Sequence, residues 1–229
     1  MLEILYKSPS AVIVYKPPGI ASQPDNSSKE DALTLTAELL VKQGEKSSLY
    51  PVHRLDLVVG GLLVIARTKN AAAELSAALS ADGIGKEYLA VCEGEAAEGT
   101  LINYLYKDKA QSKSVICSPE RQGAKYAELD VGRIASKSLD MSKLTLAKIT
   151  LKTGRFHQIR AQLSGISSPI AGDKKYGSKQ RSVDGIALFA YRLSFTLSGE
   201  KITVTKFPNV DEMPWSHFAE EIDNLSRKE

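Results

Sequence analysis

Residues 50–61 gather side chains of the kinds that carry out catalysis. The segment reads Tyr-Pro-Val-His-Arg-Leu-Asp-Leu-Val-Val-Gly-Gly and precedes an apolar run. The carboxylate of Asp56, close to His53 and Arg54, can act as a nucleophile or a base, and the glycines let a backbone approach a ligand closely. The same residues would also suit a salt bridge that closes a loop. This segment alone therefore leaves a catalytic site and a structural ion pair open.

Residues 153–160 form a second segment with functional side chains, Thr-Gly-Arg-Phe-His-Gln-Ile-Arg. The guanidinium groups of Arg155 and Arg160 can hold a carboxylate bidentately or bind phosphates at a helix N-terminus. His157 and Gln158 add hydrogen-bonding groups beside them. Both arginines would be equally at home on a solvated helix face, so the segment predicts either an anion site or a charged surface.

Basic side chains are concentrated in two further stretches that we interpret as polar loops. They are Lys107, Lys109, Lys113, Arg121 and Lys125 in the first stretch, and Lys174, Lys175, Lys179 and Arg181 around Tyr176 in the second. Solvated surface loops have such compositions too. If the two loops border one cleft together with Asp56, their summed charge attracts a nucleic-acid backbone, with an affinity that falls as salt rises.

Apolar patterns predict the strands that position these segments. Alternating or continuous apolar residues indicate strands at 11–15, 61–66, 86–92 and 147–151, and a hairpin joining 193–197 to 202–204. The first of these strands must stop at the Lys-Pro-Pro-Gly sequence of residues 16–19, because proline lacks a backbone N–H. Strands are expected to dominate the second half of the chain.

Helical spacing predicts four helices. One runs between Asp31 as N-cap and Gly44 as stop, and another follows Asn70 as N-cap. The inward residues are expected to be Leu33, Ala37 and Leu40 in the first helix, and Ala72, Leu75 and Leu79 in the second. The segment 153–160 opens a third helix that runs through Gln162 and Leu163, and the last helix begins near Pro214 and carries Trp215, Phe218 and Ile222.

Composition limits the class of protein. The chain has 229 residues, of which 43% are hydrophobic and 25% charged, so a packed core is expected and disorder is not. Together with the strand and helix pattern, this predicts one α+β domain over residues 1–229, with a mostly antiparallel mixed sheet flanked by helices and loops, although two lobes are possible. There is no apolar run of membrane-spanning length and no signal peptide, which indicates a cytoplasmic protein.

Neither a disulfide framework nor a metal site is expected. Cys92 and Cys117 are far apart in the sequence and belong to no CxxC pair. The spacing of His53, His157 and His217 does not match a set of metal ligands. The net charge of +3 is too small to indicate a nucleic-acid partner by itself, so the distribution of the charge must decide.

The order and spacing of these motifs resemble the RluA-type RNA pseudouridine synthases. The resemblance rests on His-Arg-Leu-Asp at 53–56, Lys-x-Tyr at 86–88, Gly-Arg-x-His-Gln-Ile-Arg at 154–160, Pro-Ile-x-Gly-Asp at 169–173 and, more weakly, the turn at 16–19. It covers most of the chain, up to the strand near Phe195. The chain departs from the family at Val59-Gly60, where threonine and serine are usual, and at Phe189, where histidine is frequent.

The resemblance implies an enzyme that isomerises uridines of structured rRNA or tRNA to pseudouridine without metal or cofactor. It implies that Asp56 is the catalytic carboxylate, that Arg160 pairs with it and that Tyr88 stacks on the target base. Leu188 would form an apolar wall of the pocket, and Arg54 would fill the space left by the flipped uridine. Whether Asp56 attacks the base, attacks the sugar or removes a sugar proton stays open.

The other residues that we expect to contact RNA are His53, Arg155, His157, Gln158, Lys174 and Lys175. The alternative is a catalytically impaired protein of the same fold that binds and remodels RNA, which the departure at Val59-Gly60 raises. A carboxylate glycosidase would need a second acid, and only Asp56 is a strong candidate. The start of the chain lies close to the catalytic motifs, so we expect no appended RNA-binding domain, and we expect a monomer.

Overall fold

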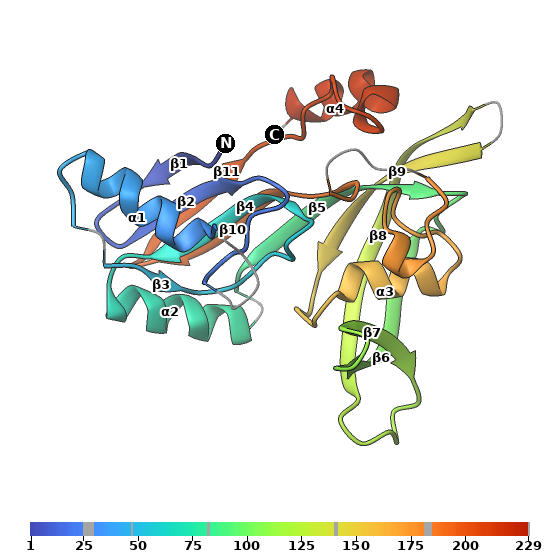
Figure 1. The fold of residues 1–229 in the computed structure, drawn as a ribbon, viewed down its shortest axis with the longest axis horizontal. Helices are drawn as coiled ribbons and strands as arrows, with labels where there is room; N and C mark the ends of the chain where they lie inside the picture. Colours follow the sequence, from blue (N-terminus) through green and yellow to red (C-terminus); the bar gives the residue numbers. More distant parts are fainter. Residues whose placement is uncertain (25–29, 47, 82, 140–141, 181–184, 229) are drawn as a thin grey trace. The chain divides into compact units, whose positions relative to one another are not determined.

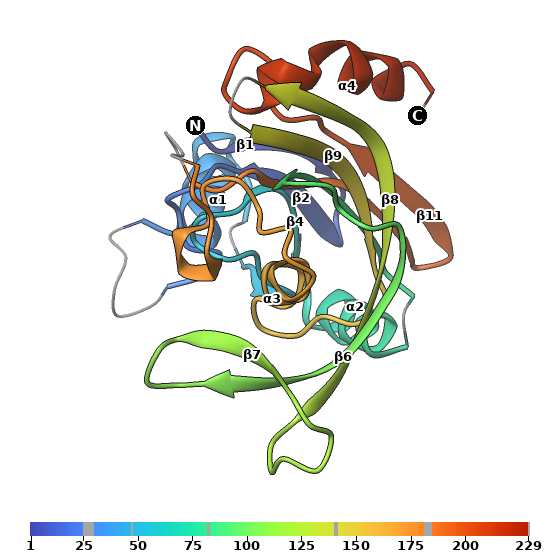
Figure 2. The same cartoon turned by 90° about the vertical axis from the view of Figure 1, so that its right-hand side faces the viewer.

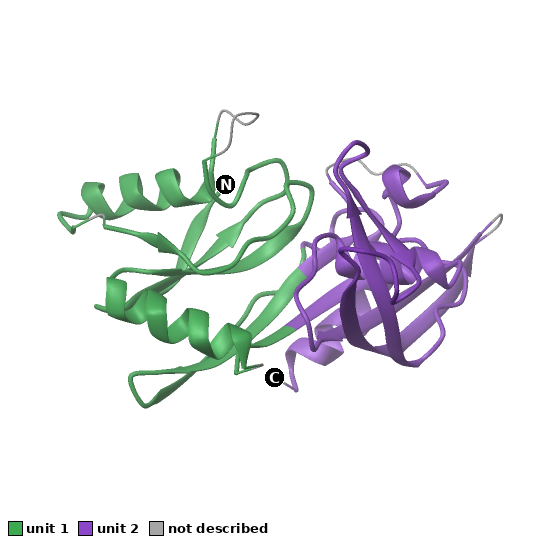
Figure 3. Ribbon diagram, turned by 90° about the horizontal axis from the view of Figure 1, so that it is seen from below, with its two compact units in different colours: residues 1–86, 190–208 green, residues 87–189, 209–229 purple. Residues whose placement is uncertain are grey.

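The computed structural model describes residues 1–24, 30–46, 48–81, 83–139, 142–180 and 185–228. The chain forms two compact units, one of residues 1–86 and 190–208 and the other of residues 87–189 and 209–229 (Figure 3). Strands β5 (Gly85–Glu93) and β10 (Leu188–Leu197) contribute residues to both. Helices flank an antiparallel arrangement of strands in the described parts, which confirms the predicted α+β class.

The first unit is built on strands in the order β1, β2, β4 and β10, with β3 beside β4 and β11 beside β10. Their bounds are Glu3–Lys7 for β1, Ala11–Lys16 for β2, Tyr50–Pro51 for β3, Gly60–Ala66 for β4 and Glu200–Thr205 for β11. Every residue of β4 is buried, as its apolar run predicts. The predicted hairpin is confirmed, because β10 and β11 pair around Ser198 and Gly199.

Two helices cover opposite faces of these strands (Figure 1). Helix α1 (Ala32–Lys42) packs with Val14 and Leu63 on one face, and helix α2 (Lys69–Ser80) packs with Val64 on the other. Successive side chains of a strand point to opposite faces, so a strand covered on both sides must be apolar throughout. This double cover explains the unbroken apolar runs in β2 and β4.

Helix α1 begins where predicted, and its inward face overlaps the predicted one. The carboxylate of Asp31 accepts a hydrogen bond from the backbone N–H of Thr34 at 2.9 Å, which confirms the N-cap. The buried residues of the helix are Ala32, Thr36 and Leu40. Leu40 is buried as predicted, and Leu33 is partly buried against the core, whereas Ala37 is only half-buried.

Helix α2 begins earlier than predicted. Its N-cap is Thr68, whose hydroxyl accepts from the N–H of Ala71 at 3.1 Å, while Asn70 lies inside the first turn. Threonine and asparagine both cap helices well. The point at which the chain leaves β4 determines that Thr68 is the N-cap. The buried residues are Ala71 and Leu75, with Ala72 and Leu79 only partly buried.

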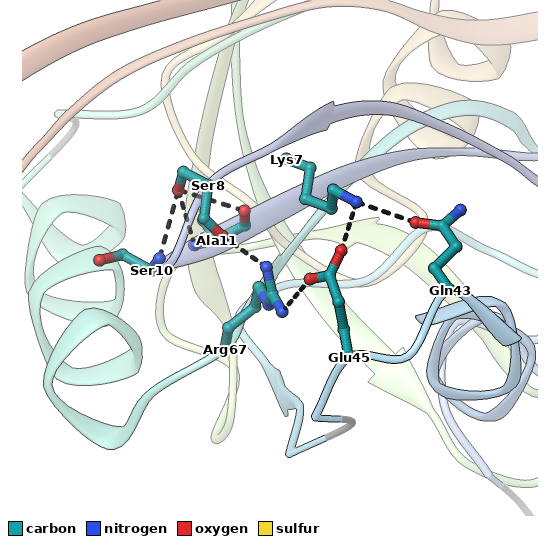
Figure 4. Close-up of polar contacts among 7 residues, drawn as sticks. All are labelled: Lys7, Ser8, Ser10, Ala11, Gln43, Glu45 and Arg67. Carbon is teal, nitrogen blue, oxygen red and sulfur yellow. Dashed lines mark hydrogen bonds and ion pairs between the residues drawn. The ribbon is translucent and has the colours of Figure 1, made fainter. Parts of the chain in front are cut away.

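A charged cluster fastens the segment after α1 to the sheet (Figure 4). The Glu45 carboxylate accepts hydrogen bonds from Lys7 and Arg67, the latter at 2.6 Å. A second nitrogen of Arg67 donates to the carbonyl of Ser8 at 2.8 Å. The cluster joins the end of β4 to the turn between β1 and β2. These hydrogen bonds, with that from Lys7 foremost, lower the pKa of Glu45.

The second unit is built on strands in the order β5, β9, β8, β6 and β7, all pairing antiparallel. Their bounds are Gly99–Asp108 for β6, Lys113–Cys117 for β7, Lys125–Leu139 for β8 and Ser142–Leu151 for β9. The basic stretch from 107 to 125 was predicted to be a loop, but it is mainly the β6–β7 hairpin. Its polar side chains hide the strand pattern because much of it is exposed.

Helix α3 (Gln158–Gly165) packs against β6 and β7 (Figure 2). A small cluster of Leu105, Ala127, Ala161 and Tyr176 fills the contact, with Tyr176 from the short 3-10 helix η1 (Lys174–Tyr176). The predicted C-terminal helix starts as the 3-10 helix η2 (Trp215–Phe218) and continues as α4 (Ala219–Ser226). Among the described residues, no helix is long and apolar enough to cross a membrane.

Candidate active site

Asp56 lies in the connection between β3 and β4 of the first unit, and its neighbours hold it through backbone contacts. The hydroxyl of Ser22 donates to the carbonyl of Leu55 and accepts from the N–H of Leu55, both at 2.9 Å. The carbonyl of Asp56 accepts from the N–H of Val59 at 3.0 Å. The half-buried carboxylate is therefore carried on a backbone that is hydrogen-bonded on both sides.

Lys16, at the end of β2, is a buried cation that interacts electrostatically with Asp56. Its side chain is 0% exposed. Its ammonium group donates to the carbonyls of Pro17 at 3.0 Å, Ile20 at 2.8 Å and Leu57 at 3.5 Å. The ammonium group thus ties the turn after β2 to the residue that follows Asp56.

Burial and the charge of Asp56 have opposite effects on the pKa of Lys16. Burial lowers the pKa of Lys16 to about 8, and the negative charge of Asp56 counteracts part of that fall. Lys16 is therefore mostly charged at pH 7 and is electrostatically coupled to Asp56. Lys16 was predicted only to end a strand and to belong to the Lys-Pro-Pro-Gly turn. A lysine that ends an otherwise apolar strand, directly before Pro-Pro-Gly, was the signal for its burial.

Gly19 and Gly61 have different structural roles in the first unit. Gly19 has φ +84° and donates its N–H to the carbonyl of Leu57 at 2.8 Å. A Cβ atom on Gly61 would lie 2.4 Å from the carbonyl oxygen of Ala190 in β10. The second glycine is thus required for close packing of two strands, whereas the sequence suggested that it served the approach of a ligand.

His53 is held inside the first unit. Its Nε2 accepts a hydrogen bond from the N–H of Val64 at 3.2 Å, which fastens the segment to β4. Burial, followed by the positive charge of Lys86, lowers the pKa of His53 to about 4, so the ring is neutral at pH 7. Arg54, the next residue, is exposed. The predicted contacts of His53 and Arg54 with RNA stay predictions.

The second unit contains the other two predicted catalytic residues, Tyr88 and Arg160. Tyr88 is buried in β5, where it pairs with Ile149 of β9, and Leu188 is buried at the start of β10. Arg160 lies in the first turn of α3. The predicted pairing of Arg160 with Asp56 joins the two units and stays a prediction.

Asp173 is a partner of Arg160 that the sequence did not reveal. Two nitrogens of the guanidinium group, Nε and Nη2, donate to the two carboxylate oxygens at 2.7 and 2.8 Å. Both residues are buried, Arg160 at 5% exposure and Asp173 at 1%. Such a bidentate pair fixes the plane of the guanidinium group. The Pro-Ile-x-Gly-Asp motif contained Asp173, but no local pattern indicates which cation it binds.

Gln158 holds the turn before α3. Its Oε1 accepts from the N–H of Arg155 at 2.9 Å and from the hydroxyl of Thr153 at 2.7 Å. Its Nε2 donates to the carbonyl of Glu128 at 3.0 Å. The buried amide therefore shapes the Gly-Arg-x-His turn, while Arg155 at its surface donates to the carbonyl of Tyr126 at 2.7 Å. RNA contacts by Gln158 and Arg155 stay predictions.

His157 occupies the left-handed region, with φ 50°, at the N-cap of α3. Its ring stacks on Phe156 with centroids 3.8 Å apart, and its Nδ1 lies 3.1 Å from the Tyr176 hydroxyl. Lys174 and Lys175 are exposed on η1, and Lys175 donates to the carbonyl of Ser112 at 3.2 Å. Arg181 lies outside the described residues.

Within the described residues, no three His, Cys, Asp or Glu side chains are grouped closely enough to bind a metal. Cys92 and Cys117 are both free thiols. Burial raises the pKa of Cys92 to about 12, which keeps it protonated and unreactive at neutral pH.

Comparisons with known proteins agree on one family. Residues 10–165 match the family model for RNA pseudouridylate synthase. A Haemophilus influenzae protein named as an uncharacterized RNA pseudouridine synthase is 31% identical, over 91% of this chain and 88% of the relative. The tRNA pseudouridine synthase C of Haemophilus ducreyi is 28% identical, over 89% and 90%. The ribosomal large subunit pseudouridine synthase D of Xanthomonas campestris is 31% identical, over 77% of this chain and 52% of the relative.

Two solved human structures share the fold. Human RNA Pseudouridylate Synthase Domain Containing 4 has a TM-score of 0.75 at 21% identity and covers 96% of this chain and 92% of that chain. Human RNA Pseudouridylate Synthase Domain Containing 1 has a TM-score of 0.73 at 22% identity, with 92% and 84% covered.

Proposed function

The chain belongs to the RNA pseudouridylate synthase family, a family of isomerases, and we propose that it converts specific uridines of structured RNA to pseudouridine with Asp56 as the catalytic carboxylate. Transfer RNA and ribosomal RNA are the candidate substrates, because relatives of both kinds match most of this chain. The proposal includes one catalytic domain formed by both units, a monomeric state and a location in the cytoplasm.

The reaction is a rearrangement that adds and removes no atoms overall. The bond between N1 of uracil and C1′ of the ribose breaks, and a bond between C5 and C1′ forms. N1 gains a proton and C5 loses one, so the mass of the RNA is unchanged. A carboxylate that acts as nucleophile or base suits the cleavage of the N1–C1′ bond, and the proton lost from C5 balances the proton gained at N1. Asp56 is proposed to supply it.

The single observation that carries the proposal is the way in which the backbone around Asp56 is held. The backbone on either side of it is bound by Ser22 and by the buried ammonium group of Lys16, which is coupled to the carboxylate. A catalytic group must be held close to its productive position before the substrate arrives. A surface aspartate without a function would not require a fully buried lysine beside it.

Arg160 and Tyr88 of the second unit and Arg54 of the first unit supply the remaining roles. Arg160, with its guanidinium plane fixed by Asp173, is proposed to orient the carboxylate of Asp56. Tyr88 is proposed to stack on the target base and to assist removal of the C5 proton. Since a paired uridine cannot be reached inside a helix, the base must leave its stack, and Arg54 is proposed to take its place.

Tritium release from RNA labelled at C5 of uridine tests the proposal, because C5 loses its hydrogen only when the new bond is complete. RNA from cells that lack the protein is the substrate, and pseudouridines are then mapped in the tRNA and rRNA fractions. Asp56→Asn keeps the size of the side chain and removes the charge. We expect it to bind RNA but to release no tritium, whereas Asp130→Asn, at an exposed ion pair, remains active.

Normal turnover by Asp56→Asn would refute the role of Asp56. RNA binding without tritium release by the wild-type protein would indicate the impaired RNA-binding alternative. Release of free uracil would indicate glycosidase chemistry instead of isomerisation.

A further inference from the structure

Two groups of cations in the second unit differ in how they are neutralised. Five cations on β8, on β9 or directly after β9 each have a carboxylate within 2.8 to 3.5 Å: Arg133, Lys137, Lys143, Lys148 and Lys152. Four others, here called the hairpin cations, lie on or beside the β6–β7 hairpin: Lys107, Lys109, Lys113 and Arg121. Across the part of the chain that the structure describes, none of these four forms an ion pair.

The local charge balance agrees with this difference. Residues 104–125 contain five cations, the hairpin cations and Lys125, against two acids, Asp108 and Glu120. The resulting local charge is +3, so the hairpin carries a clear excess of positive charge.

Aromatic rings hold three of the hairpin cations in place without cancelling their charge. The ammonium group of Lys107 lies 4.3 Å from the ring centroid of Phe156, and that of Lys113 lies 4.7 Å from the ring centroid of Tyr176. The guanidinium group of Arg121 lies 3.8 Å from the ring of Tyr106. Cation–π contacts of this kind orient a cation, and a pre-oriented side chain loses less entropy when it binds an anion.

The hairpin is also fastened to the segment that carries Arg160. Ser114 of β7 donates its hydroxyl to the carbonyl of Phe156 and its N–H to the hydroxyl of Tyr176, the latter at 2.7 Å. Two cations contact the ring of Tyr176, with Lys113 at 4.7 Å and Arg160 at 5.0 Å from its centroid. The hairpin cations are thus fastened to the segment that carries Arg160, whose own charge is paired with Asp173.

We propose that the hairpin cations bind the phosphate backbone of the RNA next to the target uridine. This inference rests on the proposed function, because that function places a polyanionic substrate at Arg160. Each cation on the two-stranded ribbon can contact a phosphate, and such contacts read no sequence. Lys174 and Lys175, on η1 beside Tyr176, extend the same surface.

The test compares two triple variants that lose the same charge. The hairpin variant is Lys107→Ala, Lys113→Ala and Arg121→Ala. The matched control is Lys137→Ala, Lys143→Ala and Lys148→Ala, which removes exposed lysines that carboxylates already neutralise. Binding to unmodified tRNA and rRNA transcripts is measured between 50 and 200 mM KCl. Tritium release from the same RNA is measured in parallel.

Each lost phosphate contact flattens the plot of log affinity against log salt by about 0.7 to 0.9. Over this fourfold change in salt, the wild-type protein should therefore lose roughly 20- to 40-fold more affinity than the hairpin variant. The control should follow the wild type. If the triple hairpin variant does not fold, Lys109→Glu at an exposed turn position tests the same surface by charge reversal.

The outcomes separate this inference from the proposed function. If the hairpin variant keeps the salt slope of the wild-type protein, and the wild-type protein releases tritium normally, the inference is wrong and the proposed function stands. An equal loss in the control would also overturn it. A loss of slope confined to the hairpin variant, without tritium release from any RNA by the wild type, would support the RNA surface and refute the proposed isomerisation. Absence of RNA binding by the wild type would refute both.

Discussion

Lys16 should set the alkaline limit of turnover. Its ammonium group binds the carbonyl of Leu57, directly after Asp56, and its positive charge is coupled to the Asp56 carboxylate. Loss of the proton removes the charge and weakens the contacts that hold the chain on either side of Asp56. We therefore expect the uncharged form to be inactive. Because burial lowers the pKa of Lys16 to about 8, this loss falls within the range of an ordinary assay.

The size of the effect follows from that pKa. A group with a pKa near 8 is about nine-tenths protonated at pH 7 and about one-tenth protonated at pH 9. The rate of a single turnover should therefore fall about tenfold between pH 7 and pH 9. Removing the charge of Asp56, which raises the pKa of Lys16, should move the titration of Lys16 below 8 in Asp56→Asn.

The contribution of Lys16 to stability should rise with pH, whereas the rate of turnover falls. The unfolded chain keeps the proton of Lys16 up to its ordinary value of 10.5, whereas the folded protein loses it near 8. Between these two values the unfolded state binds more protons, so the contribution of Lys16 to the free energy of unfolding rises with pH, by about 3 kcal/mol at most. A fall in activity over this range therefore does not arise from loss of this lysine's folding contribution.

The assay is single-turnover tritium release from pH 6.5 to 9.5, together with NMR titration of labelled lysine side chains. Lys16→Met should be slow at every pH, because it lacks the charge. Lys206→Met, which removes an exposed ion pair with Glu3, should keep the wild-type profile. A rate that stays constant to pH 9.5 while Lys16 titrates near 8 would refute the reasoning, as would a titration of Lys16 above 10.

Three further effects are expected. Asp173→Ala should lower the free energy of unfolding by roughly 3 to 5 kcal/mol in urea titrations, because it removes the Asp173 carboxylate from the buried guanidinium group of Arg160. A change below about 1 kcal/mol would contradict this expectation. Tyr88→Leu should lower kcat/KM roughly 5- to 150-fold through lost stacking of about 1 to 3 kcal/mol, whereas Tyr88→Phe should retain RNA affinity, and equal losses would argue against stacking. Relative to His53→Gln, the wild-type protein should lose up to about 3 kcal/mol of stability as pH falls from 6.5 to 4, because only the unfolded chain protonates His53 there; parallel curves would exclude this.

The parts of the fold that sequence predicted are those in which local pattern and tertiary packing agree. The apolar run of β4 is buried on both faces, and the side chain of Asp31 caps α1. The N-cap of α2 was misplaced because Thr68 and Asn70 are both competent caps and only the end of β4 decides between them. The β6–β7 hairpin was missed because its strands carry charge on exposed positions, which obscures a two-residue period.

The candidate site was less predictable than the fold, since its contacts join residues that are distant in sequence. Asp56, Tyr88 and Arg160 were identified through a family resemblance, which transfers positions but not their surroundings. The burial of Lys16 depends on strands packing around it, and the pairing of Arg160 with Asp173 depends on how η1 returns to α3. Spacing along the chain contains no information on the pairing of Arg160 with Asp173.

The departure at residues 59 and 60 can now be judged by what the structure requires there. Val59 is 2% exposed, so a hydroxyl in its place would need a buried hydrogen-bond partner. The apolar side chain of valine needs no such partner and fills the space by packing. Its backbone N–H already binds the carbonyl of Asp56. The hydroxyl of Ser22 and the ammonium group of Lys16 brace the neighbouring residues from the other side. The turn that carries Asp56 is therefore held without a hydroxyl at position 59, and the substitution gives no reason to expect an impaired enzyme.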